Sequence, residues 1–368
     1  MDVQQAKREV IEAGYRLVET GLIARTWGNV SCRIDAERFA ITPSGRSYDG
    51  LTPDDIVVVG IADLSYEGDI KPSSEKGIHA AVYTLKPDIN FVIHTHQAGA
   101  SIAGVLGKDA EVTDPEAQRR LGHRVLLAAY GLPSTKKLRK GVADAVSRSE
   151  GRALLMSHHG ALVYGEDRAA AFLAAQALED ECGRFYAPVS EQPTGEMGSS
   201  YRNEDGFVYT VGGTSVAADM VSGRAADGTL LPAEALWHLA IYRARSDVNV
   251  IRGCSLPGIA EAARQGQTIK PLLDDFAQLA GVSVRVAQPE SAGIVRALKG
   301  RNAVLVQGRG ALCCAGDADD AEAVEMVVAK CCDAHLAALL HGTLKPIASL
   351  ECLLMRFIYL KKYSKMKK

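Results

Sequence analysis

Two histidines separated by one residue follow a short apolar run in Phe91–His96. In an extended strand, side chains two positions apart point to the same face, so His94 and His96 can converge on one point. A third imidazole is offered by His159, which follows the apolar run 153–156 at the expected end of a second strand. Three imidazoles with one or two open coordination positions suit a Lewis-acid zinc ion. The spacing therefore predicts a metal site, although a lone His-x-His pair also occurs as a packed or surface pair.

Three other motifs precede these histidines in the chain. They are Gly28-Asn29-Val30-Ser31, Thr42-Pro43-Ser44-Gly45 and Ser73-Ser74-Glu75. Together with the histidines, in this order and at this spacing, they resemble the class II aldolase/adducin family over roughly residues 8–185. Members of that family include L-fuculose-1-phosphate and L-rhamnulose-1-phosphate aldolases and L-ribulose-5-phosphate 4-epimerase.

Strands rich in Val and Ile alternate with helical stretches in the first half of the chain, which indicates a layered α/β domain. The resemblance implies an α/β/α domain of class II aldolase type with a mixed, largely antiparallel central sheet. An apolar residue at every third or fourth position over residues 3–17 predicts an opening amphipathic helix that Gly21 ends.

The family resemblance implies a reaction as well as a fold. A metal held by His94, His96 and His159 would chelate the ketone and adjacent hydroxyl of a sugar phosphate and stabilise an enediolate. The resemblance places Glu75 at the metal, where it would exchange protons with that enediolate; this role requires burial to raise its pKa. The alternative is a structural glutamate in the first turn of a helix, after capping serines.

A phosphate site is expected beside the metal. Ser73 and Ser74 lie where a helix should begin and offer hydroxyls and free backbone N–H groups to an anion. The resemblance assigns Gly28, Asn29, Ser44 and Gly45 to loops that hold the substrate phosphate. Without the resemblance, Thr42–Gly45 would be interpreted only as a turn.

Tyr130 matches an aromatic residue that the family places near the substrate, although it could equally be a packing tyrosine. The fuculose-phosphate aldolases take a proton-donating tyrosine from a neighbouring subunit, but residues 111–116 of this chain contain no tyrosine. The proton donor and the substrate are therefore left open. We expect His158 to pack beside or orient the third ligand, and we expect the other histidines to be structural: His79, His123, His238, His335 and His341.

The second half of the chain repeats the first. Glu75–Tyr83 resembles Glu234–Tyr242 at an offset of 159 residues, and Gly160-Ala161-Leu162 recurs as Gly310-Ala311-Leu312 at an offset of 150. Such a long repeat indicates a duplicated domain. At the same offsets His94 becomes Gly253, His96 becomes Ser255 and His159 becomes Arg309, while Glu75 keeps its counterpart Glu234. We therefore predict an aldolase domain over 1–187, a polar linker over 188–206, a metal-free repeat over 207–345 and a C-terminal tail over 346–368.

Composition gives no indication of a nucleic-acid or membrane partner. The 42 Lys and Arg residues against 44 Asp and Glu leave a net charge of −2, and no apolar run approaches the roughly 18 residues of a membrane helix. With no signal-peptide pattern and eight cysteines without a metal or disulfide spacing, we expect reduced thiols in a cytoplasmic protein. The tail, apolar over 352–360 and then lysine-rich, is expected to dock on the protein rather than on a membrane.

These observations predict a zinc-dependent aldolase that cleaves a ketose 1-phosphate into dihydroxyacetone phosphate and an aldehyde, with Mn²⁺ or Fe²⁺ as other possible metals. The alternatives within the same chemistry are a sugar-phosphate 4-epimerase and a methylthioribulose-1-phosphate dehydratase. An adducin-like scaffold without activity is the alternative from another class. Family active sites form between subunits of a cyclic tetramer, so we expect a homo-oligomer, specifically a dimer of two-domain chains.

Overall fold

The computed structural model describes all residues except 24–26, 190–195 and 364–368. The chain divides into two compact units, and each is described by itself. Unit 1 comprises Met1–Tyr186 with His341–Lys345 and the residues from Leu360 on, and unit 2 comprises Ala187–Leu340 and Pro346–Tyr359.

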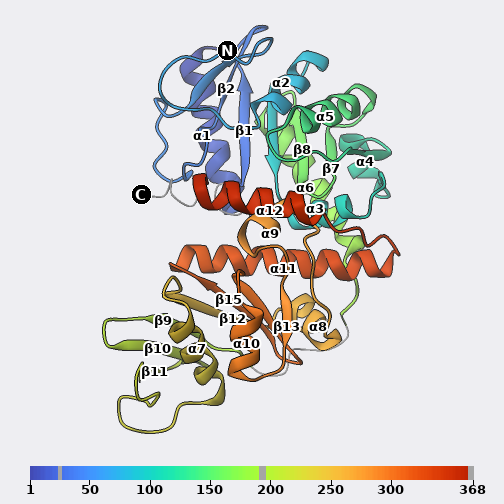
Figure 1. Ribbon diagram of the computed structural model, residues 1–368. Helices are drawn as coiled ribbons and strands as arrows, with labels where there is room; N and C mark the ends of the chain where they lie inside the picture. Colours follow the sequence, from blue (N-terminus) through green and yellow to red (C-terminus); the bar gives the residue numbers. More distant parts are fainter. Residues whose placement is uncertain (24–26, 190–195, 364–368) are drawn as a thin grey trace. The chain divides into compact units, whose positions relative to one another are not determined.

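Unit 1 is built on an eight-stranded sheet with the order β3-β2-β1-β4-β8-β7-β6-β5 (Figure 1). Every neighbouring pair is antiparallel except β6 and β7, which are parallel. The strands are β1 Gly28–Arg33, β2 Arg38–Ile41, β3 Val57–Gly60, β4 Phe91–Thr95, β5 Ala110–Glu111, β6 Arg124–Ala128, β7 Ala153–Met156 and β8 Gly160–Gly165.

Helices cover both faces of this sheet. They are α1 Val3–Glu19, α2 Lys76–Leu85, α3 Ala98–Val105, α4 Pro115–Leu121, α5 Lys136–Arg148 and α6 Arg168–Cys182. One apolar core joins α1, α3, α4 and α6 to the sheet, and a second joins α2 and α5, which lie side by side (Figure 1). The two cores confirm the predicted α/β/α layering with a mixed, largely antiparallel sheet.

The opening helix forms as its periodicity predicts. The carboxylate of Asp2 caps α1 by accepting a hydrogen bond from the backbone N–H of Gln5 at 2.8 Å. Its apolar face, which includes Val10 and Leu17, is buried against the sheet. The helix ends at Glu19, and Gly21 then takes a positive φ of 68° that glycine tolerates best.

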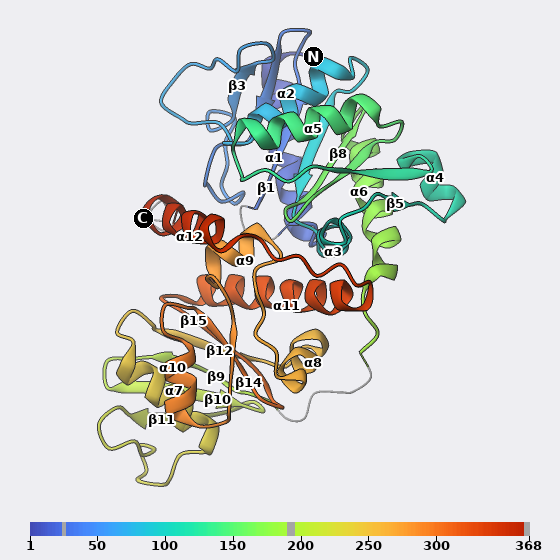
Figure 2. The same ribbon diagram turned by 45° about the vertical axis from the view of Figure 1, so that its right-hand side comes forward.

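Unit 2 repeats the sheet with seven strands in the order β11-β10-β9-β12-β15-β14-β13, of which only β13 and β14 are parallel to each other. The strands are β9 Ser199–Arg202, β10 Gly206–Val211, β11 Thr214–Asp219, β12 Val250–Cys254, β13 Arg285–Ala287, β14 Ala303–Val306 and β15 Gly310–Ala315. The helices are α7 Ala233–Ala244, α8 Pro257–Gln265, α9 Asp274–Leu279, α10 Ser291–Ala297, α11 Ala318–Leu340 and α12 Ser349–Ile358. In Figure 2, α7 and α10 lie on one face of this sheet, opposite α8 and α11.

The two sheets share their register as well as their order. In unit 1, Phe91 pairs with Gly165 across β4 and β8, and in unit 2, Val250 pairs with Ala315 across β12 and β15. These pairs have the offsets of 159 and 150 residues that the sequence repeat predicts (91 to 250 and 165 to 315). The duplicated fold is therefore confirmed, although among the described residues that precede β9 no counterpart of α1 is present.

A paired strand lies inside the stretch that we expected to be a linker. Residues 190–195 of that stretch are outside the described residues, but β9 occupies Ser199–Arg202 and pairs with both β10 and β12. The composition was misleading because β9 buries a polar side chain, Ser200, on one face and exposes a tyrosine, Tyr201, on the other. The irregular connection is thus shorter than predicted.

The C-terminal segment forms helix α12, which packs on α9 within unit 2. Cys352 and Met355 are buried, and the guanidinium of Arg356 donates hydrogen bonds to the carbonyl oxygens of Gln278 and Leu279. The end of the predicted basic tail, 364–368, lies outside the described residues. No helix in the described part of the chain has the length and apolar character needed to span a bilayer. All eight cysteines are buried free thiols.

Candidate metal centre

The paired ends of β4 and β8 bring the three predicted histidines together. His94 lies in β4, His96 follows its last residue, and His159 precedes β8. Thr95 pairs with Ala161, so the end of one strand lies beside the start of the other. A Cβ atom on Gly160 would come within 2.2 Å of the carbonyl oxygen of Thr95, so only glycine permits this close approach.

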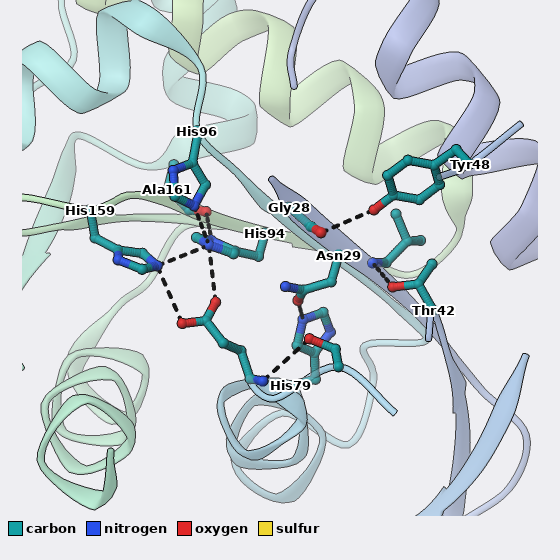
Figure 3. A network of polar contacts seen from close by, with 12 residues as sticks. Gly28, Asn29, Thr42, Tyr48, His79, His94, His96, His159 and Ala161 are labelled. Carbon is teal, nitrogen blue, oxygen red and sulfur yellow. Dashed lines mark hydrogen bonds and ion pairs between the residues drawn. The ribbon is translucent and has the colours of Figure 1, made fainter. Parts of the chain in front are cut away.

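The three imidazoles converge through their Nε2 atoms (Figure 3). The Nε2 atom of His94 lies 3.1 Å from Nε2 of His96 and 3.1 Å from Nε2 of His159. One nitrogen from each ring can be chosen such that all three lie within 4.8 Å of one another. The predicted cluster is therefore assembled.

The surroundings of His94 leave its Nε2 lone pair available. Its Nδ1 atom lies 2.8 Å from the carbonyl oxygen of Ala161, to which the Nδ1–H group donates a hydrogen bond. The ring is fully buried, and burial lowers the pKa of His94 well below its usual value. A neutral imidazole held by its Nδ1–H is the form that binds metal through Nε2.

Glu75 approaches the same point from the start of α2. Its Oε2 atom lies 3.1 Å from Nε2 of His94, and its Oε1 atom lies 3.3 Å from Nε2 of His159. Glu75 is buried, and burial by itself would raise its pKa, but the neighbouring imidazoles of His159 and His94 outweigh burial and lower the pKa below its ordinary value. The raised pKa that the acid/base role would require is therefore not found, and Glu75 is a carboxylate at neutral pH.

These donors fit a divalent metal ion. In tetrahedral zinc sites with Zn–N bonds of about 2.0–2.1 Å, the nitrogen ligands lie about 3.3 Å apart. The distances from Nε2 of His94 to Nε2 of His96 and of His159 are close to this value. A carboxylate and three nitrogen lone pairs directed at one point repel one another unless a cation or proton lies between them. Glu75 Oε1 is buried without a hydrogen-bond donor among the described residues, as expected of a carboxylate oxygen that faces a cation.

Two of the predicted phosphate-binding residues, Gly28 and Asn29, lie beside the histidines. Asn29 on β1 pairs directly with His94 on β4, so their side chains share one face of the sheet. Gly28 has a φ of 131°, and its carbonyl oxygen accepts a hydrogen bond from the hydroxyl of Tyr48 at 3.0 Å. Asn29 is buried, and Figure 3 shows it between His94 and His79.

The other four phosphate candidates lie on two adjoining loops. Ser44 donates its backbone N–H to the carbonyl oxygen of Lys71, and Ser73 donates its backbone N–H to that of Thr42, at 2.9 and 3.0 Å. Gly45 turns its loop with a φ of 72°. Ser74 lines a cavity of about 160 Å³, which is also bordered by residues at the starts of α2 and α5. The structure thus brings Ser44 close to Ser73, while Ser74 faces this cavity.

Tyr130 lies against His158. The two rings meet edge to face with their centroids 5.3 Å apart. His158 is the neighbour of His159 and has a positive φ of 60°, which is uncommon for a residue with a side chain. Tyr130 thus contacts the residue beside the third predicted ligand.

A buried hydrogen-bonded network behind Asn29 was not anticipated. It joins Ser31, His79 and Tyr83, and all three side chains are almost inaccessible to solvent. The sequence did contain a signal, because His79 and Tyr83 both recur in the second copy as His238 and Tyr242. A repeated polar pair inside an apolar helix indicates a buried network, but its link to Asn29 could not be read from the spacing.

Comparison with known proteins finds matches in both halves of the chain. The model of the family described as Class II Aldolase and Adducin N-terminal domain matches residues 8–186 and again residues 192–336. A 5-deoxy-D-ribulose 1-phosphate aldolase from Bacillus thuringiensis serovar kurstaki is 31% identical over 189 residues, which cover 50% of this chain and 86% of that protein.

Solved structures give similar matches. An L-fuculose 1-phosphate aldolase is 32% identical with a TM-score of 0.46, covering 49% of this chain and 84% of that one. YgbL from Klebsiella pneumoniae, described as a putative aldolase/epimerase/decarboxylase, is 25% identical with a TM-score of 0.46, covering 50% of this chain and 89% of that one. Each of these matches extends over about half of this chain.

Proposed function

Because the chain belongs to the class II aldolase and adducin family, we propose that unit 1 is a zinc-dependent aldolase acting on a ketose 1-phosphate. The products would be dihydroxyacetone phosphate and an aldehyde. The relatives described as sugar-phosphate aldolases support this substrate class. Mn²⁺ and Fe²⁺ are the other metals that three imidazoles would accommodate.

One observation carries the proposal, namely the convergence of three imidazole Nε2 atoms and one buried carboxylate on a single point. His94, His96 and His159 would hold the metal ion. When bound, the ion would withdraw electron density from the ketone oxygen of the substrate and so stabilise negative charge on the adjacent carbon. A packing cluster would not need a carboxylate at the point where the nitrogen atoms meet.

Glu75 would exchange the proton at the reacting carbon. In the condensation direction its carboxylate would take a proton from the hydroxymethyl carbon of dihydroxyacetone phosphate, the resulting carbanion would attack the aldehyde carbon, and the carboxyl group would pass that proton to the aldehyde oxygen as it becomes a hydroxyl. In the cleavage direction the carboxylate would accept the proton of that hydroxyl as the carbon–carbon bond breaks, and the carboxyl group so formed would deliver the proton to the carbanion carbon. Glu75 is ionised before the substrate arrives and can therefore accept a proton, although its lowered pKa makes it a weaker base than the raised pKa that this role calls for.

The substrate phosphate would be held by the loops that adjoin β1 and α2. Gly28, Asn29, Ser44, Gly45, Ser73 and Ser74 offer amide, hydroxyl and backbone N–H donors there, and no acidic side chain is among them. We further propose that Tyr130 contacts the aldehyde half of the substrate, since its ring packs beside the neighbour of His159.

Metal content and product release test this function together. We expect about one zinc ion per chain, and release of dihydroxyacetone phosphate from a ketose 1-phosphate. Both should be lost when His94 and His96 are changed to alanine. Protein that binds no metal after zinc is supplied would contradict the proposal. A product with its carbon chain intact would point instead to epimerase or dehydratase chemistry.

The assembly state is a separate proposal. Family sites form between neighbouring subunits, and unit 2 would stand in for one of those neighbours, which leads to a dimer of two-domain chains. Mass measurement in solution checks this, and a monomer that is active at every concentration would contradict it.

A further inference from the structure

We propose that His79 is a positioning residue that fixes the side-chain amide of Asn29 so that its N–H groups face the substrate phosphate. This inference rests on the proposed function, in which Asn29 meets that phosphate. It assigns a role to a histidine that neither binds the metal nor touches the reacting atoms.

The hydrogen bonds around His79 allow one consistent direction of donation. The Tyr83 hydroxyl lies 2.8 Å from Ser31 Oγ, and Ser31 Oγ lies 2.7 Å from His79 Nδ1. At the other side of the ring, His79 Nε2 forms a short hydrogen bond with Asn29 Oδ1. An amide oxygen can only accept, so Nε2 must carry the ring proton, and Nδ1 must accept from Ser31.

A neutral imidazole is required for this arrangement. His79 is fully buried, and burial lowers its pKa to about 3, so the ring carries a single proton at neutral pH. The proton lies on Nε2 because the amide oxygen of Asn29 can only accept, which leaves Nδ1 to accept from the serine hydroxyl. Asn29 thus keeps both amide hydrogens for another partner.

Asn29 stands at the edge of the metal centre. Its direct pairing with His94 puts both side chains on the face of the sheet that α2 covers. Figure 3 shows the amide oxygen of Asn29 on the His79 ring and the amide nitrogen turned away from that ring. An asparagine free to rotate by 180° would present its oxygen to the phosphate half of the time, and two oxygens repel.

Unit 2 separates the structural part of this network from the functional part. Ser200 Oγ lies 2.7 Å from His238 Nδ1 and 2.8 Å from the Tyr242 hydroxyl, the same distances as in unit 1. Gly198 occupies the position of Asn29, because it precedes Ser200 by two residues as Asn29 precedes Ser31. His238 Nε2 is consequently buried without a hydrogen-bond partner in the described residues. The hydrogen bonds among serine, histidine and tyrosine are therefore present even in the unit that lacks the metal-binding histidines. The network of unit 1 differs from that of unit 2 by the hydrogen bond from histidine to asparagine.

Two substitutions at His79 distinguish positioning from packing. The amide of asparagine reaches about as far as imidazole Nδ1, and that of glutamine about as far as Nε2. His79→Asn should therefore keep the bond to Ser31 and lose the bond to Asn29, while His79→Gln should keep a donor for Asn29. His238→Asn is the matched control, because it makes the same change in a network with no asparagine.

Binding of dihydroxyacetone phosphate to the full-length, zinc-loaded protein is measured by calorimetry, with zinc content and melting temperature as checks on folding. We expect His79→Asn to weaken binding by about 10- to 100-fold, as for loss of a hydrogen bond to a charged group. His79→Gln should recover most of the affinity, and His238→Asn should leave it unchanged. With an active enzyme, the His79→Asn change should raise KM more than it lowers kcat.

The outcomes separate this inference from the proposed function. Wild-type affinity in a folded, zinc-containing His79→Asn protein would overturn the positioning role alone. Equal losses in His79→Asn and His238→Asn would overturn it as well, because they would show a general effect on stability. Failure of the zinc-loaded wild-type protein to bind dihydroxyacetone phosphate would overturn the proposed function, and the inference with it.

Discussion

In unit 1 the carboxylate of Glu75 faces imidazoles, whereas in unit 2 the equivalent Glu234 faces the guanidinium of Arg309. Arg309 stands at the position of His159, and its NH1 nitrogen lies 3.7 Å from Glu234 Oε1. The side chains of Glu75, His94 and His159 are almost fully buried, while those of Arg309 and Glu234 are 45% and 23% exposed. The glutamate in this position thus faces nitrogen atoms in both units, but they belong to a cationic guanidinium in unit 2 and to a set of metal donors in unit 1.

The backbone differs at the same place. A Cβ atom on Gly253, the counterpart of His94, would lie 2.1 Å from the carbonyl oxygen of Gly198 and 2.5 Å from Cβ of Met197. By contrast, the contact between the first strand and the helix is retained in both units. Arg33 donates hydrogen bonds to three backbone carbonyl oxygens around the end of α2, and Arg202 does the same around the end of α7. Unit 2 therefore keeps the arrangement of strands and helices without the ligands, and its backbone leaves no room for a side chain at the position of His94.

The largest difference in activity should appear between substitutions of Glu75 in unit 1 and substitutions of Glu234 in unit 2. Glu75→Gln removes the base and should lower kcat by about 10²- to 10⁴-fold with zinc retained on the histidines. Glu234→Gln and Glu234→Ala should leave both kcat and zinc content unchanged. Steady-state kinetics and metal analysis check this, and zinc loss in a Glu234 variant would mean that unit 2 also binds metal.

Restoring the histidines to unit 2 should fail to restore a site. In the triple change Gly253→His, Ser255→His and Arg309→His, the first side chain meets the backbone of Gly198 and must displace a strand. We expect no second zinc ion and a loss of stability of about 1–3 kcal/mol, typical of overpacking. Metal analysis and urea unfolding measure both quantities, and two zinc ions per chain would show that the backbone closure is easily reversed.

A smaller difference, in the pH dependence of stability, is expected where α3 packs on α6 in unit 1 and where α8 packs on α11 in unit 2. In unit 1, Glu179 on α6 accepts backbone hydrogen bonds from Gly99 and Ala100 at the start of α3. In unit 2, Asp333 on α11 approaches Gly258 of α8 so closely that a Cβ there would lie 1.8 Å from its Oδ1 atom, and burial raises the pKa of Asp333 to about 6. Asp333 therefore binds a proton more tightly in the folded protein than in the unfolded chain.

The pH dependence of Asp333→Asn tests this contrast. Because the folded pKa exceeds the ordinary value of 3.8, the contribution of Asp333 to stability should be largest below that value and should be lost as the pH rises to about 6. The asparagine variant should lack this loss, so its stability relative to wild type should rise by about 2 kcal/mol between pH 4 and pH 8. Urea unfolding at both pH values measures the change, and an equal effect at both would rule out titration of Asp333.

The smallest effect should come from the ion pair that replaced the ligands. Arg309→Ala breaks a partly exposed contact, so we expect a loss of less than about 1 kcal/mol in the free energy of unfolding, further reduced by salt. His159→Ala is the comparison in unit 1 and should abolish zinc binding. A large loss in the Arg309 variant would mean that Glu234 depends on its partner as strongly as Glu75 does.

Much of the molecule could be predicted from short-range patterns in the sequence. The periodicity of residues 3–17 predicted α1, and the two repeat offsets predicted the shared register of the sheets. His94 and His96 share a face because strands have a period of two residues. The boundary of unit 2 was predicted less well, because the polar residues of β9 resemble those of a loop.

The sequence by itself determined which residue types were present for metal chemistry, and that the second copy had lost them. Tertiary structure alone decided the pKa of Glu75, because the direction of its shift depends on how closely two imidazoles lie, at 3.1 and 3.3 Å, in a buried site. It also decided that Asn29 accepts from His79, residues 50 positions apart in the chain. Such contacts arise from the packing of a helix on a sheet, which no local spacing specifies.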